Sequence, residues 1–296
     1  MKESAPVFSI IIPTYARPAQ LAACLQALAR LDYPRDRFEV LVVDDGSQSP
    51  PETIVTSFRE RLDVRLLMQA HAGPAAARNT GATQAKGRFL AFTDDDCMPA
   101  PDWLQTLAAR FDKASDRLIG GRTLNALSDN PYSITSQTII EFVYAYYNTD
   151  PDNARFFASN NLAVAAERFR AIGGFDATFT TSEDRELCDR WLHHRYRMTY
   201  APEVLVSHAH ALTFRSFWQQ HFRYGRGAFR FHQTRARRGW GRFTPELKFH
   251  LTLLRYPFSQ ARGRRALWLT ASLMLSQIAS AAGLMWEGMS KRSAEE

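Results

Sequence analysis

The feature that most constrains the fold of this chain is the alternation, over its first two hundred residues, of short apolar runs with helical patterns. Helix-like segments separate the four runs "VFSIIIPTY", "FEVLVVDDG", "DVRLLMQ" and "GRFLAFTDDD". Strands this apolar are typical of sheets covered on both faces. The pattern therefore predicts an α/β fold with a mostly parallel central sheet and flanking helices.

Polar residues follow three of these runs, in "PTYARP", "DDGS" and "TDDD". Ligands of parallel sheets bind beyond the carboxyl ends of the strands, so these segments are expected to share one edge. The chain has no G-x-x-x-x-G-K-[ST] loop, and no G-x-G-x-x-G follows the first strand. A P-loop enzyme and a dinucleotide oxidoreductase are therefore both disfavoured.

Three consecutive aspartates, Asp94, Asp95 and Asp96, end the fourth run. Alternation along an extended segment predicts that Asp94 and Asp96 point to one side and Asp95 to the other. Crowded carboxylates protonate or recruit a cation, and a divalent metal with oxygen ligands fits this site. The alternative is an acidic loop that caps the helix starting near Trp103. Asp102 already occupies the cap position, so the three acids need another explanation.

Two further candidates have an ordinary explanation beside a functional one. Asp44 and Asp45 end the second strand, where a carboxylate is able to accept a hydrogen bond from a nucleobase N–H, but Asp-Gly sequences also form common turns. Arg78 lies on a predicted helix just before the aspartates. It is suited to bidentate contact with a diphosphate, or it is a helix-surface arginine.

Acids and histidines near residue 200 are also candidates. Glu183 and Asp184 start a predicted helix, where acids are favoured by the helix dipole and where one carboxylate is also able to act as a general base. His208 and His210 lie at a strand end. Either imidazole is a candidate metal ligand, and either is equally well an ordinary core or surface histidine.

Charge is distributed unevenly along the chain. The net charge is +7, but between Leu212 and Arg265 thirteen Lys and Arg face one acid, Glu246, which leaves a mildly acidic body. Residues 266–286 then carry no charge, a length close to the ~20 residues that cross a bilayer. Several Ser, Thr and Gln weaken this run as a membrane span, so a helix lying on the membrane or a packing helix fits as well. The preceding arginines favour peripheral attachment to an anionic membrane.

The remaining features concern the compartment. The N-terminus enters a strand at once and shows no secretory pattern. Cys24, Cys97 and Cys188 fit no metal-binding spacing and are expected to be free thiols. We therefore expect a cytoplasmic protein attached to the inner face of the cell membrane.

Five segments occur in an order that resembles the family 2 inverting glycosyltransferases: "FSIIIPTYARPAQLAACLQAL", "FEVLVVDDGS", "GPAAARNTGATQAKGRFLAFTDDDCMPAPDWL", "SNNLAVAAERFRAIGGFD" and "SEDRELCDRW". The resemblance covers roughly residues 7 to 210. It implies a GT-A fold in residues 1–211, with a nucleotide-sugar-binding half at about 1–125 and an acceptor half at about 126–211. Residues 212–296 then form a basic, partly apolar helical extension.

The resemblance also implies roles for residues. Asp184, beside Glu183, matches the catalytic base. Metal ligands are implied at Asp96, Asp94 and a late histidine, His208 or His210. Nucleotide-sugar contacts are implied at Pro13, Tyr15, Arg17, Asp44, Asp45, Arg78, Asp94 and Asp95. Asn160 and Asn161 are implied in the acceptor region.

The function implied is transfer of a hexosyl-type group, with inversion, from a nucleoside-diphosphate sugar to a carbohydrate or lipid-linked acceptor. The expected cofactor is Mg²⁺ or Mn²⁺, a UDP-sugar is the favoured donor, and the product is a polysaccharide or glycolipid. A sugar-nucleotide pyrophosphorylase is disfavoured, because "PTYARPAQ" lacks the glycine-rich loop such enzymes use. A catalytically silent lipid- or nucleic-acid-binding protein using "FWQQHFRYGRGAFRFH" is the other alternative, although no nucleic acid partner is expected.

Overall fold

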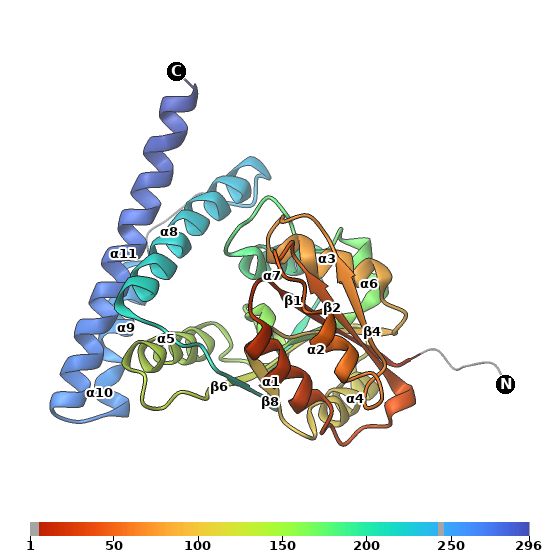
Figure 1. Ribbon diagram of the computed structural model, residues 1–296. Helices are drawn as coiled ribbons and strands as arrows, with labels where there is room; N and C mark the ends of the chain where they lie inside the picture. The colour runs from red at the N-terminus through yellow and green to blue at the C-terminus, as the bar shows by residue number, and fades with distance from the viewer. Residues whose placement is uncertain (1–5, 242–245, 296) are drawn as a thin grey trace. The chain divides into compact units, whose positions relative to one another are not determined.

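The computed structural model describes residues 6–241 and 246–295 and divides into two compact units, drawn in Figure 1. The sheet unit comprises Met1–Ala126 and Asn148–Ala209, and the helical unit comprises Leu127–Tyr147 and His210–Glu296. The predicted acceptor half, residues 126–211, is therefore split. Its first segment groups with the C-terminal helices, because it forms a helix that packs among them.

The sheet unit holds one eight-stranded sheet with the order β3-β2-β1-β4-β7-β6-β8-β5. Its strands are β1 (Phe8–Thr14), β2 (Phe38–Asp44), β3 (Val64–Met68), β4 (Phe89–Phe92), β5 (Cys97–Pro99), β6 (Leu118–Asn125), β7 (Leu162–Ala165) and β8 (Met198–His208).

Strands β3, β2, β1 and β4 are all parallel, as the apolar runs predict. Beyond β4 the sheet is mixed: β7 is antiparallel to both β4 and β6, β6 is parallel to β8, and β5 is antiparallel to β8. The sequence pattern singles out neither β5, which has three residues, nor β6, which contains two glycines.

Helices cover both faces of the sheet. They are α1 (Pro18–Leu28), α2 (Glu52–Ser57), α3 (Pro74–Gln84), α4 (Trp103–Lys113), α6 (Ala166–Ala171) and α7 (Glu183–His193), with single turns η1 (Arg35–Arg37), η2 (Pro151–Asn153) and η3 (Ser159–Asn161).

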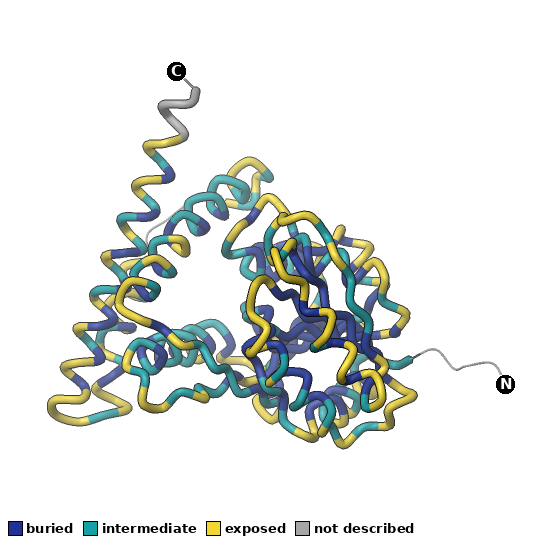
Figure 2. The backbone as a smooth tube through the Cα atoms, viewed as in Figure 1, coloured by how far each residue is buried: buried dark blue, intermediate teal, exposed yellow. Residues whose placement is uncertain are grey.

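Strand periodicity divides the core between the two faces. Ile10 and Val42 pack in one cluster with Leu25 of α1 and Trp103 of α4. On the opposite face α3 lies so close that a methyl group added at Gly81 would come within 2.6 Å of Ile11. Figure 2 shows the resulting buried centre of this unit. The sheet is thus sandwiched, and its strand ends are held rigidly.

The helical unit consists of α5 (Pro131–Tyr147), α8 (Phe214–Arg237), α9 (Leu247–Arg255), α10 (Pro257–Gln260) and α11 (Arg264–Glu295). Thr213 and Ser216 form a reciprocal capping box that starts α8. A small core of Phe142, Leu253 and Leu273 joins α5, α9 and α11.

Two glycines let α8 and α11 approach closely. A methyl group added at Gly225 would lie 1.8 Å from the carbonyl oxygen of Ser280, and one at Gly283 would lie 1.9 Å from that of Phe222. In addition, Glu287 of α11 is buried and bonded to Arg226 and Arg230 of α8, at 2.7 and 2.6 Å. Steric fit and two ion pairs to a buried carboxylate therefore hold the two helices together.

This packing predicts opposite effects for two glycine substitutions. Gly225→Ala should lower the free energy of unfolding by ~1–3 kcal/mol or more, since its methyl meets backbone that has no room to move. Gly288→Ala on α11 is the matched control, because its methyl meets only the Phe229 side chain at 3.1 Å. That change should be neutral, or stabilising by up to ~1 kcal/mol. Urea unfolding measures both, and equal effects would contradict the close packing of α8 and α11.

Candidate active site

The three aspartates leave the sheet in a turn rather than in a strand. Strand β4 ends at Phe92, and Asp94–Asp96 precede β5. Asp94 bonds Arg78, whereas Asp95 and Asp96 both bond Arg17. The predicted alternation, with Asp94 and Asp96 on one side, is therefore wrong: the extended backbone that it requires ends before the acids begin.

Arg17 is the cation nearest to Asp95 and Asp96. Its Nη1 donates to Asp95 at 3.2 Å and to Asp96 at 3.0 Å, while Thr14 donates to Asp95 at 2.8 Å. Burial raises the pKa of Asp95 to about 6, although Arg17 and Thr14 oppose that rise. The Arg17 side chain is about half exposed, so the edge of this cluster is open to solvent.

A strand pairing brings Asp96 to His208. In the β5–β8 ladder Cys97 is opposite His208, and His208 Nε2 lies 3.1 Å from Asp96 Oδ1. Burial alone would lower the pKa of His208, but the hydrogen bond and charge of Asp96 outweigh it, so the pKa is raised. The predicted partners Asp96 and His208 therefore meet.

The donor atoms at this point fit a divalent cation. Among the described residues, Asp96, Cys97 and His208 place one donor atom each within 4.8 Å of one another. A carboxylate oxygen and an imidazole nitrogen are usual ligands for Mn²⁺, and Mg²⁺ accepts the carboxylate. Cys97 is a poor ligand here, since burial and the nearby aspartates raise the pKa of its thiol well above the usual value. The group contains His208; His210 belongs to the helical unit.

Arg78 is buried between two carboxylates. Its Nη2 donates to Asp94 at 2.6 Å and its Nη1 to Glu183 at 2.9 Å, and the guanidinium carbon lies 5.5 Å from the Phe175 ring centre. Burial would lower the pKa of Arg78, but the charges of Asp94 and Glu183 raise it above its usual value. Both terminal nitrogens therefore bond protein carboxylates, while the buried Nε has no hydrogen-bond partner among the described residues. The diphosphate contact of Arg78 stays a prediction.

Asp184 follows Glu183 in the first turn of α7. Ser182, which precedes this pair, is one of three described non-glycine residues with a left-handed backbone, at φ 68°. Another is Ala16, beside Arg17, so strained backbone borders the acid cluster on two sides. Burial, and then the like charge of Glu183, raise the pKa of Asp184 to about 7.

Asp44 and Asp45, which are predicted to contact the nucleobase, both accept hydrogen bonds from protein groups. Asp44 accepts from the amide of Ser47 at 3.1 Å, and Asp45 accepts from the amides of Ala72 and Gly73 at 2.9 and 2.8 Å. Asp45 thus shapes the loop that leads into α3.

Two aromatic rings remain open at the same edge. Tyr15 is exposed, and its ring centre lies 4.5 Å from that of the exposed His71. These rings offer a stacking surface, whereas Pro13 is buried within β1.

Asn160 and Asn161 are buried. The Asn161 amide donates to the carbonyls of Arg122 and Val204 and accepts from the Trp103 indole, at 3.0, 2.9 and 2.9 Å. Asn160 accepts from Thr123 at 3.3 Å. Asn161 therefore fastens β6, β8 and α4 together, which fits a structural role better than acceptor contact.

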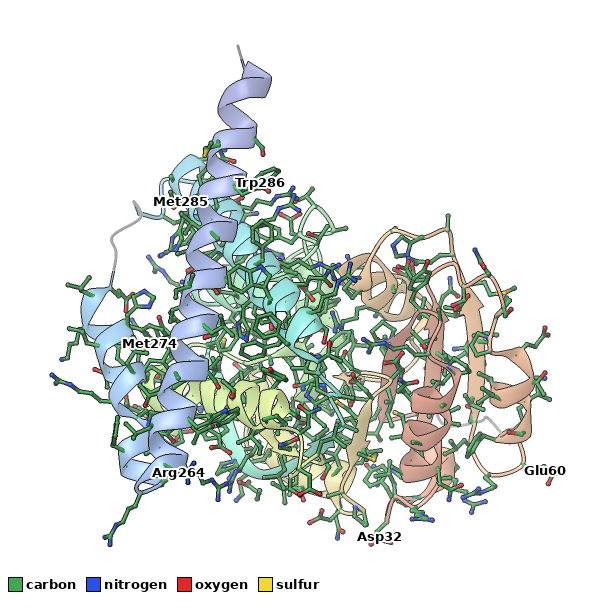
Figure 3. All side chains as sticks on the ribbon, turned by 60° about the vertical axis from the view of Figure 1, so that its left-hand side comes forward. Asp32, Glu60, Arg264, Met274, Met285 and Trp286 are labelled. Carbon is green, nitrogen blue, oxygen red and sulfur yellow. The ribbon has the colours of Figure 1, made fainter. Side chains whose placement is uncertain are left out.

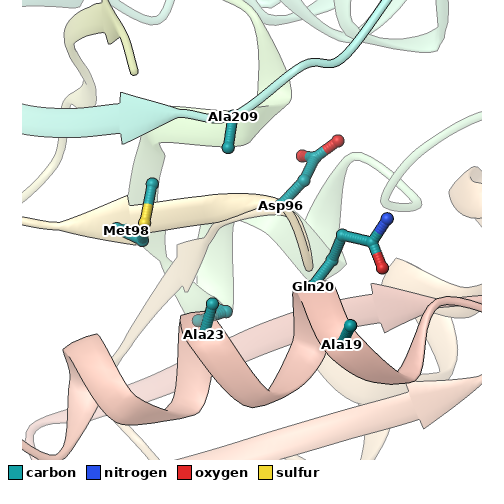
Figure 4. A pocket seen from close by; sticks show the side chains of 7 residues that line it. Ala19, Gln20, Ala23, Asp96, Met98 and Ala209 are labelled. Carbon is teal, nitrogen blue, oxygen red and sulfur yellow. The ribbon is translucent and has the colours of Figure 1, made fainter. Parts of the chain in front are cut away.

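A pocket of about 230 Å³ lies beside Asp96 (Figure 4). Its other lining residues are mostly small or apolar: Ala19, Gln20, Ala23, Cys24, Met98 and Ala209. This volume is below the ~300 Å³ usual for a pocket that holds a whole ligand.

Sequence reasoning missed Thr14 and His71. Both follow or end strands at the carboxyl edge of the sheet, the same signal that identified the aspartates. A threonine or a histidine in such a loop is too common to be selected without its partners.

Comparison with known proteins gives a consistent result. The family model described as "Glycosyl transferase family 2" matches residues 9–173. Glycosyltransferase AglE of Haloferax volcanii is 28% identical over 229 residues, which is 77% of this chain and 74% of that protein. Validoxylamine A glucosyltransferase of Streptomyces hygroscopicus subsp. jinggangensis is 31% identical over 67% of this chain, which spans only 54% of that relative.

Solved structures support the fold. A mannosyltransferase from Pyrobaculum calidifontis, solved with GDP-Man and Mn²⁺, superposes with a TM-score of 0.68 at 20% identity, covering 96% of this chain and 88% of that one. Residues 1–349 of TarS of S. aureus, in complex with UDP-GlcNAc, give a TM-score of 0.56 at 17% identity, covering 97% and 92%. The predicted α/β fold of the GT-A type, with a helical C-terminal extension, is confirmed.

The burial of Arg78 yields a stability prediction. Arg78→Met should lower the free energy of unfolding at pH 7.5 by ~3 kcal/mol or more, because it leaves Asp94 and Glu183 without their cation. Arg110→Met is the matched control. It removes the exposed pair with Glu203 and should cost at most ~1 kcal/mol. Chemical denaturation measures the free energy of unfolding of both variants. Equal losses of stability would show that Arg78 is not the buried counter-charge of Asp94 and Glu183.

Proposed function

The chain belongs to glycosyl transferase family 2, and on that premise we propose that it transfers a sugar with inversion from a nucleoside-diphosphate sugar to an acceptor hydroxyl, aided by a divalent metal. The observation that carries the proposal is the meeting of Asp96 with His208 on the same acidic edge as Asp94, Glu183 and Asp184. The enzyme class sets aside the silent lipid- or nucleic-acid-binding alternative.

In the proposed site Asp96 and His208 hold the metal, and Asp94 lies close to the donor. A bound divalent cation supplies charge that stabilises the departing diphosphate. Five carboxylates, Asp94, Asp95, Asp96, Glu183 and Asp184, lie near two arginines, Arg17 and Arg78, and near His208. This excess of negative charge favours a cation at the site.

Asp184 is the proposed general base. It takes the proton from the acceptor hydroxyl as that oxygen attacks the anomeric carbon from the face opposite the diphosphate. The bond from the anomeric carbon to the phosphate oxygen breaks, and its electron pair leaves with the nucleoside diphosphate. A single displacement inverts the configuration and needs no enzymic nucleophile. A carboxyl with a pKa of about 7 is well matched to this task near neutral pH.

Tyr15 and His71 are proposed to stack on the nucleobase, since both rings are exposed and adjacent. We favour a uridine donor, with guanosine as the alternative, because the two similar structures described above hold UDP-GlcNAc and GDP-Man. A carbohydrate or lipid-linked acceptor at the inner face of the cell membrane completes the proposal, and a polysaccharide or glycolipid is the product.

Calorimetry tests the metal site directly. UDP and GDP are titrated into the protein with Mn²⁺ and again with EDTA. We expect one of them to bind only with the metal. Asp96→Asn should weaken that binding at least ~10-fold, in the range that loss of metal-site groups causes. Asp102→Asn, on the following helix start, is the control and should bind as wild type does. Binding that is unchanged by EDTA would refute metal-dependent donor capture.

Kinetics test the base. Asp184→Asn should lower kcat by ~10²–10⁴-fold while donor binding is retained. The wild-type rate should fall as pH drops through about 7, because the neutral acid that forms below its pKa cannot accept the proton.

Glu183→Gln tests which of the two neighbouring acids, Glu183 or Asp184, is the general base. It should remain active, with its pH midpoint shifted downward, because a like charge beside Asp184 is removed. Loss of activity in Glu183→Gln together with retention in Asp184→Asn would reverse the assignment.

A further inference from the structure

One face of α11 is apolar and exposed along nearly its whole length. Leu267, Met274, Ile278, Met285 and Met289 are each 50–66% exposed. Their spacing places them on one side of the helix, over about 33 Å at 1.5 Å per residue. Trp268 and Trp286 lie along one border of this face, near its two ends. We call these seven residues the α11 stripe; Figure 3 labels three of them.

No charge interrupts the α11 stripe until Glu287, and the carboxylate of Glu287 is turned inward. It is 3% exposed and bonds Arg226 and Arg230 on the opposite side of α11. The outer face of α11 is therefore apolar and exposed, while its inner face packs on α8.

The positions of the charged residues on α8 and α11 bear on whether α11 crosses a bilayer or lies on its surface. The helical segment Gly263–Ser290 is long and apolar enough to cross a membrane. A crossing by the uncharged run 266–286 would leave Glu287, Arg226 and Arg230 at the edge of the hydrocarbon. Arg223 of α8 follows Phe222, whose carbonyl faces Gly283, so a crossing would place that arginine inside the hydrocarbon, at a cost that disfavours it. A helix lying in the plane of the interface buries the α11 stripe and leaves α8 in water.

The charged residues beside the α11 stripe indicate what kind of surface covers it. Arg262, Arg264 and Arg265 are exposed at and just before the start of α11. In a parallel second copy these arginines of the two chains would lie together, with no acid on the α11 stripe to balance them. Anionic headgroups balance them, and tryptophans are favoured at the depth of the headgroups.

We propose that the α11 stripe lies in the plane of an anionic bilayer, with the flanking basic residues among its headgroups. The proposal deepens the membrane attachment included in the proposed function, by naming the surface, the lipid charge and the in-plane orientation. It does not depend on the transfer chemistry.

Vesicle co-sedimentation of the full chain tests the surface, using phosphatidylcholine alone or with 30% phosphatidylglycerol. Wild type should bind the anionic vesicles. Met274→Glu/Met285→Glu should weaken that partition at least ~10-fold, since each change puts a charge where the stripe meets acyl chains. The matched control is Met68→Glu, an equally exposed methionine of the sheet unit, which should bind as wild type does. Circular dichroism confirms that each variant is folded.

A second pair of variants tests the charge. Arg264→Gln/Arg265→Gln should lose roughly 30-fold in partition to anionic vesicles and little to neutral ones, as two removed charges imply. Asp184→Asn should bind vesicles as wild type does, so failure of the transferase proposal is distinguished from failure of this one.

Three outcomes would overturn the inference. Equal binding by Met274→Glu/Met285→Glu and Met68→Glu would show that the stripe is not the contact. Wild type that stays with vesicles through an alkaline carbonate wash would indicate a crossing. A wild-type dimer in solution that the double variant converts to a monomer, with vesicle binding unchanged, would assign the stripe to a second copy of the chain.

Discussion

The arrangement of acids at the edge of the sheet depends on one buried guanidinium. Arg78 lies between Asp94, which follows β4, and Glu183, which begins α7. Without it, two carboxylates from distant parts of the chain would meet in a buried place with no counter-charge, at a cost of several kcal/mol. Asp184 lies next to Glu183, and burial and the charge of Glu183 raise its pKa although Arg78 opposes that rise. Arg78, which the sequence offers as either a diphosphate contact or a helix-surface arginine, is thus a buried cation that bonds two acids of the site.

The other half of the site depends on backbone pairing. Strand β5 has three residues, yet its register against β8 sets Asp96 beside His208, while the loop after β1 brings Arg17 to the same aspartate. Left-handed backbone at Ala16 and Ser182 shows that both neighbouring loops are held in unfavourable conformations. The sandwiched sheet is rigid enough to maintain them.

The two units bury their charges differently. The sheet unit concentrates carboxylates at one edge, whereas the helical unit places the carboxylate of Glu287 between two arginines and keeps its outer face apolar. Glycines at positions 225 and 283 make that inner packing possible. An arginine-rich helix is thereby tied to an apolar one.

Local patterns in the sequence determined the parallel strands, their flanking helices and the edge at which the acids gather, because apolar periodicity and strand ends are properties of neighbouring residues. Tertiary structure decided what those residues contact. It ended β4 at Phe92 and so turned Asp95 toward Arg17, it buried Arg78, and it used Asn161 to fasten the core. It also placed α5 with the C-terminal helices. Each of these outcomes depends on partners far away in the chain, which no short-range pattern records.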